Sequence, residues 1–210
     1  MNIAVIGASA GLGLEVVKRA LQRNHAVTAL SRSSLQIETD QTIISIQGSA
    51  TSKSDLSKAI QHADAVIVAL GTGKNMKATT LFSDFAKQLV AVQEGTKSET
   101  PVLFVTGFGA GESQNYVTKF VKLFLKFFLK DVYADKTEME NIISHSKLNW
   151  IGVRPGRLMD GALTEKYRLE TTLFKGIKIG AINRTDLADF LVKQAENPTY
   201  LKQFVSISNK

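Results

Sequence analysis

The feature that most constrains the fold lies at the start of the chain, where a short apolar run, residues 3–6, leads directly into a glycine-rich segment. Glycines stand at positions 7, 11 and 13, a spacing that differs from the commoner Gly-x-Gly-x-x-Gly. Glycine allows a tight turn and a close approach of the backbone to a ligand. A strand, a glycine-rich turn and a helix in this order predict a dinucleotide-binding site. The residues predicted to hold the pyrophosphate are Gly7, Ala8, Ser9, Ala10, Gly11, Leu12 and Gly13.

The residues that follow have the apolar spacing of an amphipathic helix. Apolar side chains recur three, four, seven and eight positions after Gly13, at Val16, Val17, Ala20 and Leu21. Gly13 therefore belongs to the helix face that packs on the sheet. The free N–H groups and the positive dipole end of such a helix favour a phosphate. The alternative interpretation is a glycine-rich turn without a ligand.

Strand and helix patterns alternate along the whole chain. Short apolar runs, most of them separated by amphipathic helices, occur at residues 3–6, 26–30, 43–46, 65–70, 102–105, 150–153 and 204–207. This alternation predicts an α/β fold with a doubly wound, mostly parallel sheet of about seven strands. We expect one Rossmann domain that spans residues 1–210, and ligands bind such sheets beyond the carboxyl ends of the strands.

The loop after the second strand bears on the choice of cofactor. It reads Ser31-Arg32-Ser33-Ser34 and lacks the acidic residue that holds the ribose 2′-hydroxyl of NAD. Arg32 can bind the 2′-phosphate of NADP through two hydrogen bonds, with Ser33 beside it. The sequence therefore predicts that NADP(H) is preferred over NAD(H). The alternative is an ordinary surface arginine.

Two further loops are predicted to border the cofactor. Gly48, Ser49 and Ala50 follow the third strand and are expected beside the adenine. Ala69, Leu70, Gly71 and Thr72 follow the fourth strand and are expected along a ribose. Each loop taken alone is also compatible with a simple strand-ending turn.

Five stretches of the chain resemble the atypical short-chain dehydrogenases/reductases, in the branch that includes NmrA-like proteins and the flavin/biliverdin reductase B type. The stretches are residues 7–13, 31–32, 65–71, 150–156 and 182–191, so the resemblance covers nearly the whole chain. It implies a Rossmann domain of seven to eight strands without the long substrate domain of the extended enzymes. The branch includes both reductases and cofactor-binding regulators.

The catalytic residues depart from the ordinary short-chain pattern, in which a tyrosine stands four residues before a lysine. Here Tyr133 precedes Lys136 by three residues and Val132 takes the expected place, a rotation of about 100° on a helix. We therefore expect Tyr133 to point away from the face of Lys136. The resemblance assigns Lys136 to the nicotinamide ribose, and Thr106 stands where related enzymes face the nicotinamide with serine or threonine. A solvated lysine and a threonine satisfied by backbone are the alternatives.

Pro155 and Gly156 follow the sixth strand and are predicted to shape the wall near the nicotinamide. Arg184 and Asp186 are interpreted as part of a structural turn, outside the site. The three histidines have no metal-ligand spacing, and there are no cysteines, so no metal site is predicted.

Composition excludes few classes of protein. The formal net charge of +7 could serve an anionic cofactor, a nucleic acid or a membrane surface. Nucleic-acid binding is disfavoured because the sequence has no zinc-finger spacing, RNA-binding aromatic signature or convincing helix-turn-helix. No transmembrane segment is predicted, and a cytoplasmic location is the default expectation.

Residues 117–132 form an unusually apolar predicted helix. Only one face is polar, and it carries Lys119, Lys122, Lys126 and Lys130. One interpretation is a core helix with its lysines in water. The other is a hydrophobic contact surface, such as a substrate-pocket wall, a homodimer contact or a membrane-surface patch.

Together these patterns predict an oxidoreductase that transfers hydride from NADPH to a small-molecule acceptor such as a flavin, a quinone or another carbonyl or aromatic compound. Such acceptors do not demand a strong side-chain acid, because the cofactor carries the chemistry. The alternative is a non-catalytic NADP(H)-sensing regulator of NmrA-like type. A nucleic-acid-associated factor is a third and weaker hypothesis.

Overall fold

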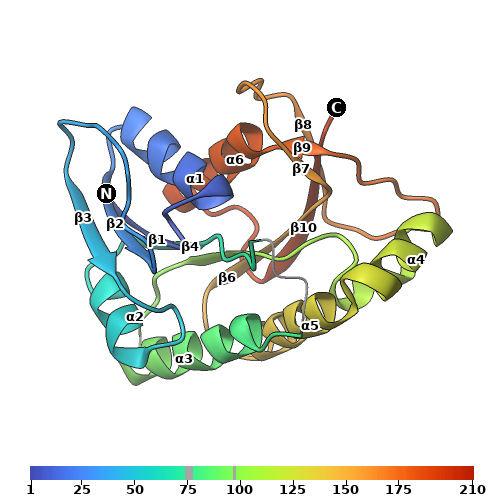
Figure 1. The fold of residues 1–210 in the computed structure, drawn as a ribbon, viewed down its shortest axis with the longest axis horizontal. Coiled ribbons are helices and arrows are strands. Elements are labelled where there is room, and N and C mark those ends of the chain that lie inside the picture. Colours follow the sequence, from blue (N-terminus) through green and yellow to red (C-terminus); the bar gives the residue numbers. More distant parts are fainter. Residues whose placement is uncertain (74–77, 97) are drawn as a thin grey trace.

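The computed structural model describes residues 1–73, 78–96 and 98–210, and its centre is a twisted eight-stranded sheet (Figure 1). The strand order is β3-β2-β1-β4-β5-β6-β10-β8. The strands are β1 (Asn2–Ile6), β2 (Ala26–Ser31), β3 (Ile43–Gln47), β4 (Ala65–Val68), β5 (Val102–Val105), β6 (Trp150–Pro155), β8 (Tyr167–Glu170) and β10 (Gln203–Asn209). The predicted Rossmann fold is confirmed, since the order reverses between β1 and β4.

All seven predicted strands are present and pair in parallel. The eighth strand, β8, was not predicted, and it pairs antiparallel to β10 at the sheet edge. Its sequence, Tyr-Arg-Leu-Glu, gives only a short alternation of apolar and charged side chains. Two further short strands, β7 (Leu158–Met159) and β9 (Ile182–Asn183), form a separate parallel pair.

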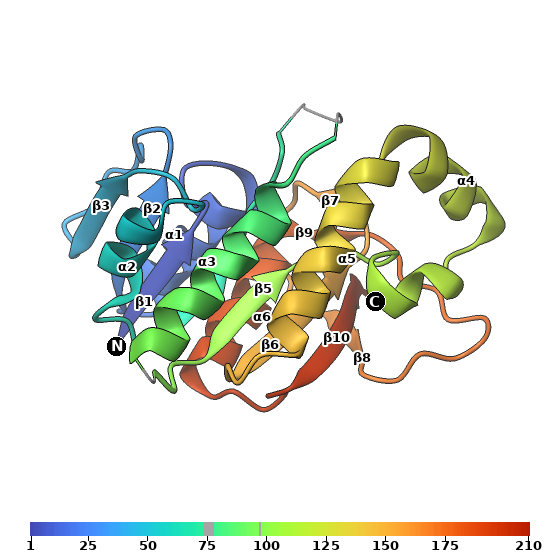
Figure 2. The same cartoon turned by 90° about the horizontal axis from the view of Figure 1, so that it is seen from below.

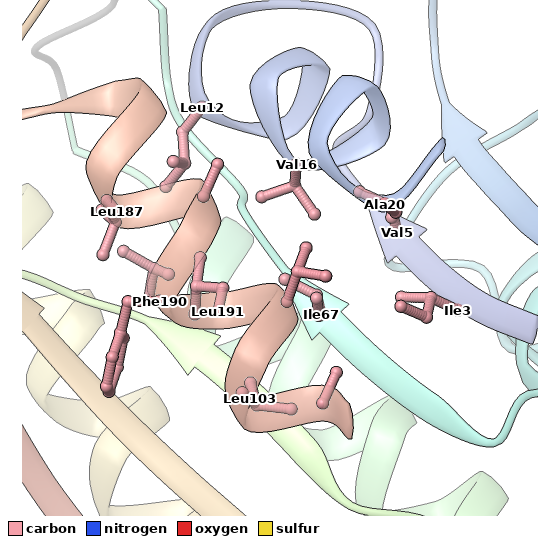
Figure 3. Packing of buried hydrophobic residues seen from close by; sticks show 14 of the residues in the cluster. Ile3, Val5, Leu12, Val16, Ala20, Ile67, Leu103, Leu187, Phe190 and Leu191 are labelled. Carbon is pink, nitrogen blue, oxygen red and sulfur yellow. The ribbon is translucent and has the colours of Figure 1, made fainter. Parts of the chain in front are cut away.

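Helices cover both faces of the sheet. Figure 1 shows α1 (Gly11–Gln22) and α6 (Arg184–Glu196) on one face, and α2 (Lys53–Ile60), α3 (Leu81–Thr96) and α5 (Lys130–Ser144) on the other. Each face has its own apolar core, because strands buried on both sides present alternate side chains to each layer. In Figure 3 side chains of α1 and α6, Leu12, Val16, Leu187 and Leu191 among them, gather over Ile67 of β4 and Leu103 of β5.

A buried carboxylate ties α5 to the start of α3. Asp135 is 7% exposed and accepts hydrogen bonds from the backbone N–H groups of Phe82, at 2.9 Å, and Ser83, at 3.1 Å. These groups lie in the first turn of α3, where N–H groups lack partners within the helix. A side-chain cap of this kind contributes about 1 kcal/mol. Asp135 thereby fixes the position of α5 and of the neighbouring Lys136.

The predicted helix over residues 117–132 is divided in two. A short 3-10 helix, η1 (Gly111–Asn115), precedes α4 (Lys119–Phe128), and the backbone leaves the helical conformation at Leu129 before α5 begins. Figure 2 shows α4 at one end of the molecule, beyond the sheet. No residue of α4 is buried, so the interpretation of this segment as a core helix is wrong. Its length and periodicity are those of a helix, but the sheet face is already covered by α3 and α5.

Within the described residues, no helix combines the length and apolar character needed to cross a membrane. The same part of the chain contains no group of three or more histidine, aspartate or glutamate side chains placed to hold a metal ion.

Candidate functional site

A cleft of about 630 Å³ lies at the carboxyl ends of the parallel strands. It is lined by the turns that follow β1 to β5 and by the first turns of α5. Most residues predicted from the sequence meet there. Those that line the cleft are Gly7, Ser9, Ala10, Gly11, Leu12, Arg32, Ser33, Gly48, Ser49, Ala50, Ala69, Leu70, Gly71, Thr72, Thr106 and Lys136.

The glycine-rich turn can be built only from glycine at two positions. Gly7 has a φ of +89°, and a Cβ there would lie 2.8 Å from the carbonyl oxygen of Ala69. A Cβ on Gly13 would lie 2.0 Å from the carbonyl oxygen of Gly7, because the first turn of α1 packs directly on the loop. Ala10 precedes α1 without a side-chain cap, so the first N–H groups of the helix are left for a ligand. The cradle therefore fits a pyrophosphate.

The far end of the cleft is suited to a second phosphate. Arg32 is exposed at the rim, and its backbone carbonyl accepts a hydrogen bond from Gln47 while its guanidinium faces solvent. The nearby carboxylate of Asp55 turns away and accepts the N–H of Ser49 at 3.0 Å, a bond that lowers its pKa. No carboxylate stands among the cleft-lining residues that the structure describes.

Among the described residues, three cations line the same cleft and give it a positive electrostatic character. They are Arg32 at one end, Lys136 at the other, and Arg184 beside the glycine turn, where its Nε would lie 3.8 Å from a Cβ on Gly11. With three cations and no carboxylate among the described lining residues, the cleft attracts an anionic ligand.

Lys136 is held at the inner end of the cleft. Its Nζ donates a hydrogen bond to the Thr106 carbonyl at 2.7 Å, and it lies 5.2 Å from the Phe82 ring centroid and 5.4 Å from that of Tyr133. Burial lowers the pKa of Lys136 to about 8, while the attraction of the Glu140 carboxylate acts in the opposite direction. The ammonium group is thus desolvated and fixed, with two of its three hydrogens free for a ligand.

The hydroxyl of Thr106 is hydrogen-bonded within the protein. Its hydroxyl donates to Glu140 at 2.6 Å and so belongs to the network beneath the cleft, which leaves its backbone carbonyl for Lys136. Glu140 also accepts from Arg154 at 3.1 and 2.7 Å, and both side chains are almost fully buried. Glu140 therefore fixes the Thr106 hydroxyl as a donor, and the expectation that this side chain faces the nicotinamide stays a prediction.

Tyr133 also differs from the expectation that it points away from Lys136. Its side chain lines the cleft, and its hydroxyl would lie 2.8 Å from a Cβ on Gly107. Both residues lie within α5, three positions apart, and side chains at this spacing are neighbours on a helix, so the expectation that they face apart is wrong. Burial raises the pKa of the phenol, and the group is therefore protonated at neutral pH.

Four predicted residues lie outside the lining of the cleft. Ala8 and Gly13 are buried behind the glycine turn, in contact with the sheet and the loop backbone. Pro155 ends β6 and pairs with Ile207, and a Cβ on Gly156 would lie 1.6 Å from the carbonyl oxygen of Gly180. Pro155 and Gly156 are therefore absent from the described lining of this cleft, and their place near the nicotinamide stays a prediction.

Several lining residues were not predicted. Arg184 comes from the far end of the chain, and its ion pair with Asp160, at 2.5 Å, positions it at the start of α6. The sequence offered a weak signal, since Arg184 lies in a stretch that carries the family resemblance but had been interpreted as a turn. The sequence does not distinguish the apolar residues that line the inner end of the cleft from ordinary core residues. These lining residues are Leu81, Phe82, Leu129 and Val132.

The fold and the glycine-lined, cationic cleft define a dinucleotide-binding protein of the Rossmann class. The chain belongs to the NAD(P)H-binding family, whose model matches residues 7–198. This membership and the structural likenesses agree with the resemblance to atypical short-chain reductases.

Three solved structures illustrate the likeness. SP1627 of Streptococcus pneumoniae, provisionally named as an NADH-flavin reductase, has a TM-score of 0.79 and 26% identity, with 100% of both chains covered. The anaerobillin reductase ChuY of Escherichia coli has a TM-score of 0.77 and 20% identity, over 100% of this chain and 97% of that one. The oxidoreductase ylbE of Lactococcus lactis has a TM-score of 0.83 and 15% identity, over 100% and 91%. These likenesses show that the Rossmann fold extends over the whole chain.

Proposed function

We propose that this protein transfers hydride from NADPH to a small planar acceptor, such as a flavin, a quinone or another aromatic or carbonyl compound. The observation that carries the proposal is one continuous cleft with an exposed arginine at one end and a half-buried lysine beside apolar walls at the other. A bound NADPH supplies the hydride. The protein binds and orients the cofactor and the acceptor, and it excludes water from the site.

Each part of the cleft has a proposed role. The N–H groups of the glycine turn and the start of α1 hold the pyrophosphate, with Arg184 as a nearby cation. Arg32 and Ser33 bind the 2′-phosphate, which accounts for the preference for NADP(H) over NAD(H). The turn at Gly48, Ser49 and Ala50 borders the adenine, and the turn at Ala69, Leu70, Gly71 and Thr72 follows the ribose. Lys136 hydrogen-bonds the ribose next to the nicotinamide.

The inner end of the cleft supports a planar apolar acceptor. Leu81, Phe82, Leu129 and Val132 supply its apolar walls. Tyr133 and Lys136 are the titratable groups described at this end, and neither is a strong acid, because burial raises the pKa of the phenol and that of the ammonium lies near 8. A flavin or a quinone accepts hydride without strong side-chain acid catalysis, whereas a simple ketone benefits from a proton donor.

The test is oxidation of NADPH by purified protein with riboflavin or menadione as acceptor, followed at the nicotinamide absorbance. We expect turnover well above the uncatalysed rate, and a loss of that turnover in Lys136→Ala. The matched control is Lys147→Ala, whose side chain lies on the surface after α5 and outside the cleft. Absence of turnover with flavins, quinones, aldehydes and ketones would refute the proposal.

The second candidate is a non-catalytic NADP(H)-sensing regulator. It is favoured by the engagement of the Thr106 hydroxyl with Glu140 and by the raised pKa of the Tyr133 phenol, which leave neither hydroxyl activated as a proton donor. NADPH binding without turnover, together with a partner protein whose affinity changes with NADPH, would favour this candidate over the reductase.

A further inference from the structure

Helix α4 exposes a continuous apolar face. Its four phenylalanines, Phe120, Phe124, Phe127 and Phe128, are 80%, 47%, 70% and 56% exposed, and Leu123 beside them is 55% exposed. A phenylalanine carries roughly 200 Å², so the four rings alone expose on the order of 500 Å². This is near the upper end of the largest apolar patch on a typical monomer, and such patches mark interaction sites.

The polar face of the same helix is purely cationic. At about 100° per residue, Lys119, Lys122 and Lys126 fall within an arc of about 60°, while the apolar side chains occupy the remaining face. The sequence has no acidic residue between Glu112 and Asp131. The helix contacts the protein through Leu125, whose Cδ1 would lie 2.6 Å from a Cβ on Gly109, and this contact leaves Phe120 and Phe127 directed away from the core.

We propose that α4 docks the protein on the surface of an anionic phospholipid membrane. An interfacial helix of this kind buries its aromatic face at the headgroup and acyl boundary while its lysines pair with lipid phosphates. The exposed aromatic face and the lysine row of α4 both match an anionic membrane surface. The position of the helix at one end of the molecule leaves it free to lie flat on such a surface (Figures 1 and 2).

A second copy of the chain fits the face less well. A stable dimer buries roughly 800 Å² on each partner, more than the four rings expose. A second copy of α4 also offers no carboxylate with which the lysines could pair. Charge complementarity therefore selects the anionic lipid. This inference does not depend on hydride transfer.

Sedimentation with phosphatidylcholine vesicles that contain phosphatidylserine tests the proposal. We expect the protein to sediment with these vesicles, much less with phosphatidylcholine alone, and less as salt is raised. The double variant F120S/F127S should bind at least tenfold more weakly without loss of thermal stability, because both rings are exposed. The matched control is Ile44→Ser, on β3 at the opposite edge of the sheet, where a 55% exposed apolar side chain is removed.

The cationic part is tested by neutralising the helix lysines. The variant K119Q/K122Q/K126Q should lose at least tenfold in affinity for the anionic vesicles, whereas the equal change in charge in K18Q/K53Q/K58Q should have little effect. Failure of the protein to sediment with anionic vesicles overturns the proposal, as does equal binding by F120S/F127S. A dimer in sedimentation velocity that F120S/F127S dissociates, without vesicle binding, would assign the face to a second copy instead.

Discussion

We propose that the choice of cofactor depends on Arg32, and its replacement by alanine gives a quantitative test. The guanidinium is exposed at the rim of the cleft, and among the described residues no side chain accepts a hydrogen bond from it. Its full donor set is available to a 2′-phosphate, and little desolvation opposes binding. A charge-assisted hydrogen bond contributes about 1.5–3 kcal/mol, and exposure favours the lower end of that range.

We therefore expect Arg32→Ala to weaken NADPH binding by about 1.5 kcal/mol, or roughly tenfold, and to leave NADH binding nearly unchanged. The assay is fluorescence titration with both cofactors at several salt concentrations, since the lost ion pair should also flatten the salt dependence. Arg168→Ala, which removes a surface arginine outside the cleft, is the control. Equal affinities for NADPH and NADH in the unaltered protein, or an equal loss for both in Arg32→Ala, would refute the reasoning.

Three further predictions concern the remainder of the cleft. Gly11→Ala should weaken NADPH binding at least tenfold by calorimetry, because φ is +54° at this position and the new methyl group enters the pyrophosphate cradle. The control is Gly176→Ala, which introduces similar backbone strain at φ +91° with open space around it and should bind NADPH normally. NADPH affinity should fall as pH rises through about 8, because the Lys136 ammonium loses its proton and its charge there. Lys136→Met should abolish that pH dependence. The opposite trend, or an unchanged pH profile in the variant, would contradict the role of Lys136. The same pKa lies below the ordinary value of 10.5, so between about pH 8 and 10.5 the unfolded chain holds the extra proton and the contribution of Lys136 to the free energy of unfolding rises with pH. Tyr133→Phe should change flavin or quinone turnover by less than tenfold, because burial raises the pKa of the phenol and leaves it unactivated; a hundredfold loss in kcat would establish a tyrosine acid.

The sequence by itself determined the class of fold and the position of the glycine-rich turn. Seven apolar runs with helical patterns between them left one arrangement, a doubly wound parallel sheet, and each strand was found where it was predicted. The glycine turn was equally readable, because a strand, a turn and a helix are adjacent in the chain and their geometry is local. The loops after the strands followed from the same rule, since parallel strands all end at one edge.

Only the tertiary structure decided which side chains line the cleft. Thr106 is held by Glu140, 34 residues away, and Arg184 enters the cleft from the last helix. Such contacts depend on the packing of distant elements, which local spacing does not record. The break at Leu129 separates α4 from α5 and leaves α4 exposed. Helical periodicity predicted an apolar face for that segment, but whether protein or another surface covers the face depends on how much of the sheet α3 and α5 already occupy.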